Sequence, residues 1–411
     1  MRTVDAAGLP IGDEHPPRIM GVLNVSKESP YDPSVFDDPG EAAAYVDEEL
    51  IDQGADIVDV GLESANKRFE VLSAEGELER LETAIQTIES VSGEAVFSIE
   101  TRYHEVAEEA LDRGFDMVND ICGFADPEMP RVCAERDVAV AKMASPPDLT
   151  RPGAIEDVDD IYDALSLNGF TDKTLVDPAF GGWSEDKTLA DDRETFRRLR
   201  EFRGLGYPIL VSINRKNFLR EVAGRSTEEA LPVSLAATSM AVERGAHVIR
   251  THDVAETRDA ALIGHEFARS RVRERGAGDV AVEELDVTAP AEARRHLDRL
   301  GAADAADAAR DAATGVFELG GLSDGDIGAL STAAARSGAT VVVGDGGDVQ
   351  AARGDVAPRS DGGSDSGPDG RSALLFGTPR ALAGFPDRVD DRSEASDGLA
   401  AALDTIAEAV E

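Results

Sequence analysis

The sequence predicts an α/β fold, an eight-stranded (β/α) TIM barrel followed by a smaller C-terminal α/β domain. From Arg18 to about Phe267, short apolar runs rich in Val and Ile alternate with amphipathic segments. Such runs are typical of parallel strands that are buried on both faces and joined by helices. Eight units in about 250 residues fit a closed barrel. The alternative, an open doubly wound sheet, is disfavoured because no G-x-G-x-x-G motif follows the first strand.

The expected strands are 19–25, 57–61, 96–100, 117–119, 138–142, 175–177, 209–213 and 248–250, and residues 41–53 are typical of the helices between them. A recurrent signature supports this assignment. Glycine precedes the second, fourth and eighth strands, in QGAD at 53–56, RGFD at 113–116 and RGAH at 244–247. A glycine there can end the preceding helix in the left-handed conformation before a strand begins. The barrel is therefore assigned to residues 18–270.

The C-terminal region, residues 271–411, is rich in Ala, Asp and Gly, and its role cannot be deduced from its sequence. Strands are expected at 316–319, 340–343 and 373–376. A helix at 324–336 would join the first two as a βαβ-like unit. The Gly/Ser/Asp-rich segment 353–371 is expected to be a mobile loop.

Charge is the unusual feature of the composition. The chain has 82 acidic and 41 basic residues, a net charge of −41, and only six of the bases are lysine. Concentrated salt screens such self-repulsion, so this composition indicates a halophilic protein. It also argues against nucleic acid or an anionic membrane as a partner. The polar N-terminus and two isolated cysteines, Cys122 and Cys133, favour a cytoplasmic protein.

Polar side chains follow the expected strands, at the end of a barrel where active sites are found. A single such residue is more often a turn former or a helix cap. A polar residue after every strand predicts instead a ring of amides and carboxylates with cations on the last two strands, suited to a heterocycle that carries phosphate. The residues at the strand ends are Asn24, Glu63, Ser64, Glu100, Arg102, Asn119, Asp120, Lys142, Asp177, Asn214, Arg215, Lys216, Arg250, His252 and Asp253.

The motifs around these residues resemble those of dihydropteroate synthase, a family of pterin-binding barrels. The similar motifs are IMGVLNVS at 19–26, NDI at 119–121, DPAFG at 177–181, SINRK at 212–216 and RTHDV at 250–254. The resemblance covers about residues 18–267, and with the acidic composition it indicates a halophilic archaeal type. It implies a transferase of folate biosynthesis that condenses 6-hydroxymethyl-7,8-dihydropterin pyrophosphate with p-aminobenzoate and releases pyrophosphate.

The resemblance also implies roles for individual residues. Asn24 would hold Mg²⁺ with the pyrophosphate. Glu100 and Lys216 would be catalytic, with Glu100 stabilising the cation that develops on the pterin methylene. Lys216 would also help to bind the substrates. The other substrate-binding residues would be Asn119, Asp177, Ser64, Arg215, Arg250 and His252. A homodimer is a further expectation.

Two loops depart from the family pattern. The first, SKESPYD at 26–32, diverges, and the second, GLESANKR at 61–68, lacks a Thr-Arg pair that Lys67 or Arg68 would have to replace. Glu100 also stands where the family has aspartate. Two other functions therefore stay open, a pterin-dependent methyltransferase domain and a non-catalytic pterin-binding paralogue.

Overall fold

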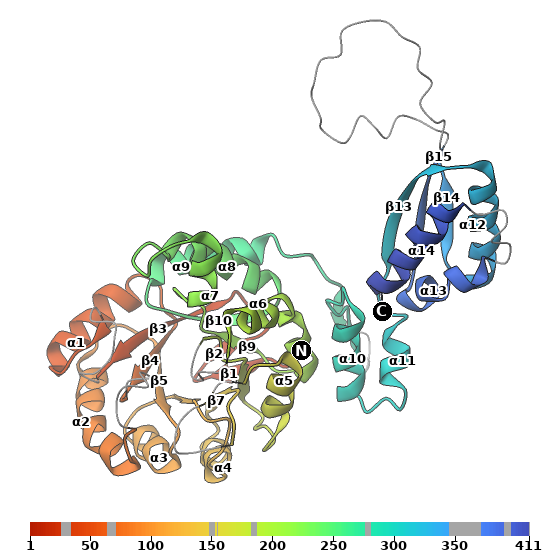
Figure 1. Ribbon diagram of the computed structural model, residues 1–411. Coiled ribbons are helices and arrows are strands. Elements are labelled where there is room, and N and C mark those ends of the chain that lie inside the picture. Colours follow the sequence, from red (N-terminus) through yellow and green to blue (C-terminus); the bar gives the residue numbers. More distant parts are fainter. Residues whose placement is uncertain are drawn as a thin grey trace, which may run out of the picture. The chain divides into compact units, whose positions relative to one another are not determined.

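The computed structural model describes residues 1–25, 34–63, 71–147, 153, 155–181, 187–275, 281–344, 371–389 and 396–410. The chain forms two compact units, Met1–Glu284 and Leu285–Glu411, so the first unit extends beyond the expected 18–270 range at both ends (Figure 1). No helix in the described ranges is long and apolar enough to cross a membrane.

The first unit contains the predicted closed barrel of eight parallel strands, in the order β10-β3-β4-β5-β6-β7-β8-β9. Neighbouring strands are in register along the chain, for example Asn24 beside Gly61 and Gly61 beside Glu100. The barrel strands are β3 (Arg18–Asn24), β4 (Ile57–Gly61), β5 (Val96–Thr101), β6 (Met117–Asp120), β7 (Ala139–Met143), β8 (Thr174–Asp177), β9 (Ile209–Val211) and β10 (Ala246–Thr251).

Helices surround the barrel, as Figure 1 shows. They are α1 (Pro39–Tyr45), the π-helix η2 (Val46–Ile51), α2 (Ala74–Ser90), α3 (His104–Asp112), α4 (Glu128–Glu135), α5 (Val158–Ser166), α6 (Leu189–Arg197), the 3-10 helix η3 (Leu199–Leu205), α7 (Asn217–Ala223), α8 (Leu231–Glu243) and α9 (Val254–Glu266). The three signature glycines, Gly54, Gly114 and Gly245, have φ of 102°, 109° and 101°. A Cβ at Gly245 would come within 2.5 Å of Arg203 Nη1, so this joint requires glycine.

The barrel interior has an apolar layer toward the amino ends of the strands, here called the lower layer. Inward-facing residues of the strands pack together, and an N-terminal hairpin, β1 (Val4–Ala6) and β2 (Leu9–Ile11), packs against them through Val4, Ala6 and Ile11. The larger apolar core lies between the strands and the surrounding helices. A second hairpin, β11 (Arg273–Arg275) and β12 (Ala281–Glu283), completes the unit. Apolar side chains fill this end of the barrel interior, and in such barrels the active site lies at the carboxyl ends of the strands.

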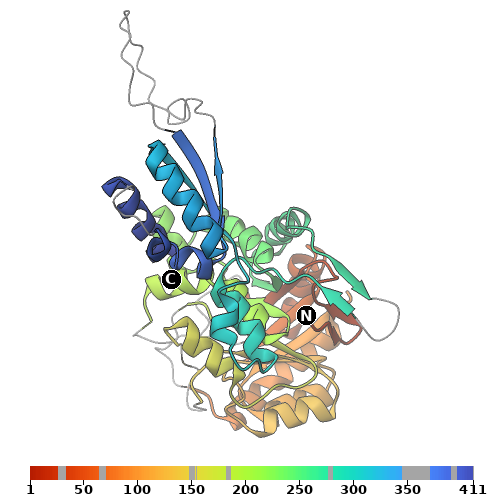
Figure 2. The same ribbon diagram turned by 90° about the vertical axis from the view of Figure 1, so that its right-hand side faces the viewer.

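The second unit is a three-stranded antiparallel sheet with the order β13-β15-β14. As the expected βαβ-like unit implies, α12 joins two strands that run parallel, but β13 and β14 are not neighbours, because β15 lies between them and pairs with both in antiparallel fashion. The helices α12 and α14 lie on one face of the sheet (Figure 2). Residues 353–370 of the expected mobile loop lie outside the described residues. The elements are α10 (Pro290–Arg299), α11 (Ala305–Ala309), β13 (Gly315–Leu322), α12 (Asp324–Ser337), β14 (Thr340–Val343), β15 (Arg371–Gly377), α13 (Pro379–Ala383), η5 (Pro386–Arg388) and α14 (Asp397–Val410).

Candidate active site

A layer of polar side chains lies directly above the apolar layer of the barrel interior. Side chains on a strand alternate between its two faces, so the residues two positions after the buried Ile57, Met117 and Leu175 also point inward. Those residues are Asp59, Asn119 and Asp177, and all three are at least 95% buried. The alternation therefore places three polar groups together at the carboxyl ends of β4, β6 and β8.

Arg250 at the end of β10 joins this layer across the barrel. Its Nε donates to Asp59 Oδ2 at 2.7 Å, and its Nη2 donates to Glu100 Oε2 at 2.7 Å. Asn119 Nδ2 donates to the same Asp59 oxygen at 3.0 Å. The other oxygen, Asp59 Oδ1, is buried and has no hydrogen-bond partner in the described part of the chain. A buried acceptor of this kind is costly unless a ligand supplies the donor.

Glu100 is held in a form that changes charge near neutral pH. Burial raises the pKa of Glu100 to about 7, although the charge of Arg250 lowers it. Burial lowers the pKa of Arg250, but the charges of Glu100 and Asp59 outweigh it and raise that pKa further above its ordinary value, so the guanidinium stays charged. The guanidinium that was expected to bind phosphate therefore already contacts two carboxylates.

Asp177 and Lys216 form the opposite part of the site. Burial raises the pKa of Asp177 to about 6, despite the hydrogen bond from the Ala179 N–H and the charge of Lys216. Burial likewise lowers the pKa of Lys216, while the charge of Asp177 opposes the shift. The Lys216 side chain passes over Gly181, where φ is 102° and a Cβ would come within 2.9 Å of Lys216 Nζ. Glycine at 181 thus gives the lysine room beside the carboxylate.

His252 and Arg215 follow β10 and β9. Burial, followed by the charge of Arg250, lowers the pKa of His252 to about 3, so its imidazole is neutral. Arg215, which was expected to contact phosphate, forms a two-fold hydrogen bond with Asp253, from Nε to Oδ2 and from Nη2 to Oδ1, each 2.8 Å long. Its guanidinium is therefore held by the protein.

Asn24 lies at the mouth of the barrel, on the end of β3. Its Nδ2 donates to Ser34 Oγ at 2.9 Å, which leaves Oδ1 on the side of Gly61. A Cβ at Gly61 would come within 3.1 Å of Asn24 Oδ1 and 3.9 Å of Glu100 Oε1. Two side-chain oxygens therefore lie close to the same glycine. Ser64, Lys67 and Arg68, the expected residues of the second loop, lie outside the described residues, as do residues 26–32 of the first loop.

Two of the strand-end residues do not belong to the site. Lys142 points outward from β7, because the inward positions are Ala139 and Ala141. Its Nζ donates to the carbonyls of Leu165, Leu167 and Gly169, at the end of α5. Asp120 also points outward and accepts the N–H groups of the turn after β6, from Cys122 and Phe124. These two residues therefore stabilise a turn and a helix end, and they do not line the site.

Sequence reasoning missed Asp59 and Ser98, which pair in register on β4 and β5. Both are fully buried. A signal for Asp59 was present, since a carboxylate interrupts the apolar strand IVDVG two residues before its end. Sequence reasoning also missed the contacts of Arg102, which is 1% exposed and bonds Glu63 Oε2 at 2.7 Å and the Leu72 carbonyl at 2.9 Å.

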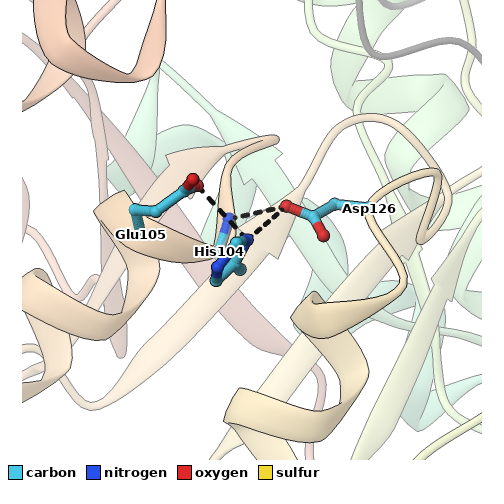
Figure 3. Close-up of side chains that lie close together, drawn as sticks. All are labelled: His104, Glu105 and Asp126. Atoms are coloured by element: carbon cyan, nitrogen blue, oxygen red, sulfur yellow. Dashed lines mark hydrogen bonds and ion pairs between the residues drawn. The ribbon is translucent and has the colours of Figure 1, made fainter.

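A group of possible metal ligands lies elsewhere, at the start of α3. His104, Glu105 and Asp126 place one ligand atom each within 4.8 Å of one another (Figure 3). Asp126 Oδ2 contacts His104 Nδ1 at 2.7 Å and accepts the His104 N–H, while Oδ1 accepts the Glu128 N–H. These bonds link the first turns of α3 and α4, so we interpret the group as a structural contact.

Comparison with known proteins identifies the family to which the barrel belongs. The model of the pterin-binding enzyme family matches residues 20–252. The dihydropteroate synthase of Bacillus subtilis is 31% identical over 242 residues, which are 57% of this chain and 83% of that protein. A probable bifunctional folylpolyglutamate synthase/dihydropteroate synthase of Haloferax volcanii is 34% identical over 250 residues, and the match spans 58% of this chain but only 29% of that longer protein.

Solved structures agree with the sequence comparison. Dihydropteroate synthase from Thermus thermophilus, in complex with 4-aminobenzoate, superposes with a TM-score of 0.53 at 29% identity and covers 65% of this chain and all of that chain. The enzyme from Coxiella burnetii, in complex with pteroic acid, gives 0.54 at 28% identity over 64% of this chain and 98% of that chain. The chain described here therefore belongs to the pterin-binding enzyme family, within which its relatives are dihydropteroate synthases.

Proposed function

We propose that this chain condenses 6-hydroxymethyl-7,8-dihydropterin pyrophosphate with p-aminobenzoate. The amine nitrogen forms a bond to the pterin methylene, the C–O bond to pyrophosphate breaks, and the amine loses a proton. The observation that carries the proposal is the buried polar layer formed by Asp59, Asn119 and Asp177, which Arg250 joins through Asp59 and beside which the half-buried Lys216 lies. Family membership agrees with it.

A pterin ring has an edge of neighbouring N–H donors and acceptors, and the buried layer offers the matching groups. Carboxylate oxygens of Asp59 and Asp177 accept hydrogen bonds, while the Asn119 amide and the Lys216 ammonium donate them. The unpartnered Asp59 Oδ1, buried within the described residues, would gain a donor from the ring. We assign the pterin to this layer for that reason.

The pyrophosphate would lie toward β10 and the mouth of the barrel. Arg250 would supply charge there, and His252, which is neutral, would donate an N–H to a phosphate oxygen. Asn24 suits Mg²⁺, which takes oxygen ligands and is commonly shared between a protein oxygen and phosphates. When bound, Mg²⁺ would neutralise charge on the leaving group. Glu100, beside Arg250, would stabilise positive charge on the pterin methylene.

The test is the release of pyrophosphate by the purified protein in molar KCl with both substrates and Mg²⁺. Lys216→Ala should abolish pterin binding and release. Lys173→Ala is the matched control, because Lys173 lies just before β8, at the opposite end of the barrel, where it donates to the Asp137 carbonyl. Pterin binding by the unmodified protein without any release of pyrophosphate would refute the synthase and favour a non-catalytic binder.

We further propose a salt-adapted cytoplasmic homodimer. The charge of −41 supports the salt adaptation. The outer surface of the α8–α9 pair supports the dimer. No charged residue occurs between Leu231 and Val242 of α8, and Met240, Ile263 and Phe267 are 45, 55 and 78% exposed. Sedimentation of the unmodified protein and of Phe267→Asp in molar KCl would test this, with dimer expected for the first and monomer for the second.

A further inference from the structure

Arg215 is more completely engaged by the protein than a substrate-binding arginine would be. Nε and Nη2 donate to the two oxygens of Asp253, and Nη1 donates to the carbonyls of Thr227 and Glu228 at 2.8 and 3.1 Å. All three guanidinium nitrogens therefore donate to protein groups. The backbone N–H of Arg215 donates to Ser234 Oγ at 2.8 Å, on α8.

Asp253 is bound with equal completeness. It also accepts Asn214 Nδ2 at 2.8 Å, and its own N–H donates to Thr251 Oγ1 at 3.0 Å. Burial opposes ionisation of the carboxylate, but the hydrogen bonds from Arg215 and Asn214 outweigh it and lower the pKa of Asp253, so the group stays ionised. The Arg215 and Asp253 side chains are only 15 and 13% exposed, so solvent screens the pair little.

The ion pair connects the segments that carry two proposed substrate contacts. Arg215 directly precedes Lys216, the residue before α7, and Asp253 directly follows His252. Arg215 also has φ of 52°, a left-handed conformation that is unfavourable for a residue other than glycine unless the surroundings hold it. The backbone at this position therefore depends on the hydrogen bonds that the side chain and the N–H make.

We infer that Arg215 is a positioning residue, whose ion pair with Asp253 sets the backbone of Lys216 and His252, and that it does not itself bind phosphate. The inference rests on the proposed function, which places those two residues at the pterin and the pyrophosphate. To bind phosphate through Nε or Nη1, the guanidinium would have to give up a contact to Asp253 or the two carbonyls, and the loss of the Asp253 contact would leave a largely buried carboxylate with fewer donors.

Asp253→Ala separates the two roles, because they predict opposite effects on anion binding. If Arg215 only positions its neighbours, loss of Asp253 should weaken both pyrophosphate and 6-hydroxymethylpterin by about 10- to 100-fold, as Arg215→Ala should. The double variant should be little worse than either single variant, since both changes break one contact. If Arg215 were a phosphate ligand, loss of Asp253 would release it, and pyrophosphate affinity would stay unchanged or rise.

Calorimetric titration with inorganic pyrophosphate, and separately with 6-hydroxymethylpterin, in molar KCl measures both affinities. The titration needs no turnover, so it tests the role of Arg215 even if the protein proves to lack synthase activity. Asp253→Asn keeps the side-chain volume should the alanine variant fail to fold. Arg193→Ala is the matched control, because Arg193 makes a 2.5 Å ion pair to Glu221 of α7 on the surface, and both affinities should stay within about twofold of those of the unmodified protein.

Steady-state kinetics add a readout that a general loss of structure would not change. Arg215→Ala should raise KM for the pterin substrate by about 10-fold or more and lower kcat, with KM for p-aminobenzoate unchanged. A partly unfolded enzyme would instead lower kcat alone. Arg215→Lys can still reach Asp253 but cannot form the two-fold contact, so its KM for the pterin substrate should lie between those of the unmodified protein and Arg215→Ala. Loss of pyrophosphate binding alone, with pterin binding and its KM intact, would overturn the inference.

Discussion

Glu77, in the first turn of α2, should make the stability of the barrel depend on pH near neutrality. The residue is 1% exposed, accepts a hydrogen bond from Thr101 Oγ1 and lies 4.0 Å from Arg102 Nη1. Burial raises its pKa to about 7, although the Thr101 bond and the Arg102 charge lower it. Between the unfolded value and about 7, the folded chain binds more protons than the unfolded chain. The unfolding free energy therefore falls as pH rises through this window.

The size of the effect follows from the shift from 4.5 to about 7. Full ionisation should cost about 3 kcal/mol of unfolding free energy. Glu77→Gln resembles the protonated acid, so it should match the unmodified protein near pH 4 and exceed it by up to about 3 kcal/mol near pH 8.5.

Urea unfolding in molar KCl at several pH values measures this difference. Glu75→Gln is the control, because Glu75 lies in the same turn of α2 but is exposed, and its effect should stay within about 0.5 kcal/mol at every pH. If Glu77→Gln became more destabilising as pH rose, Glu77 would have to be an ionised partner of Arg102, and the argument from burial would be wrong.

Three further predictions concern other parts of the molecule. Lys142→Met should lower the unfolding free energy by about 3 kcal/mol in urea, because three carbonyls at the end of α5 lose their donor. Pterin affinity should stay unchanged, and a large loss of affinity would place Lys142 in the site after all. Asp59→Asn should weaken pterin binding by about 10-fold or more in calorimetry, because it replaces an acceptor and leaves Arg250 with one carboxylate. Normal affinity would mean that Asp59 only neutralises the charge of Arg250 and does not bind the pterin. The thermal midpoint should rise between about 0.1 and 1 M KCl, as the Debye length falls from about 10 to about 3 Å; a flat response would contradict adaptation to salt.

The barrel could be predicted from the sequence because its determinants are local. A strand buried on both faces must be a short apolar run, and a glycine with positive φ separates helix from strand at joints such as Gly54 and Gly114. The C-terminal sheet could not be predicted in the same way. The run β13–α12–β14 has the local pattern of a parallel unit, and these two strands do run parallel. Only the pairing of the distant β15 with both of them reveals that they are not neighbours and that the sheet is antiparallel.

Within the site, the direction of a side chain decided which predictions the geometry supports. Asn119 and Asp177 lie two residues after inward-facing apolar residues, whereas Lys142 lies one residue after the inward-facing Ala141 and points to the helices. Counting alternate positions from an inward-facing apolar residue, Ala139 on β7 or Ile57 on β4, excludes Lys142 and finds Asp59. The alternation of side chains along each strand therefore indicates which residues point inward, whereas the position of the strand end alone does not.

The arginines near the site show that residue type alone does not reveal whether a side chain binds substrate. In a chain with twice as many acids as bases, an arginine beside a predicted site suggests an anionic ligand. Excess acid has the opposite consequence, because a buried arginine can find an internal carboxylate. Arg250 has Asp59 and Glu100, and Arg215 has Asp253. Whether an arginine binds substrate therefore depends on how many of its donors the fold has already used. By that measure Arg250, which bonds its two carboxylates through Nε and Nη2, keeps at Nη1 a capacity for phosphate, whereas Arg215 uses all three nitrogens on Asp253 and the backbone.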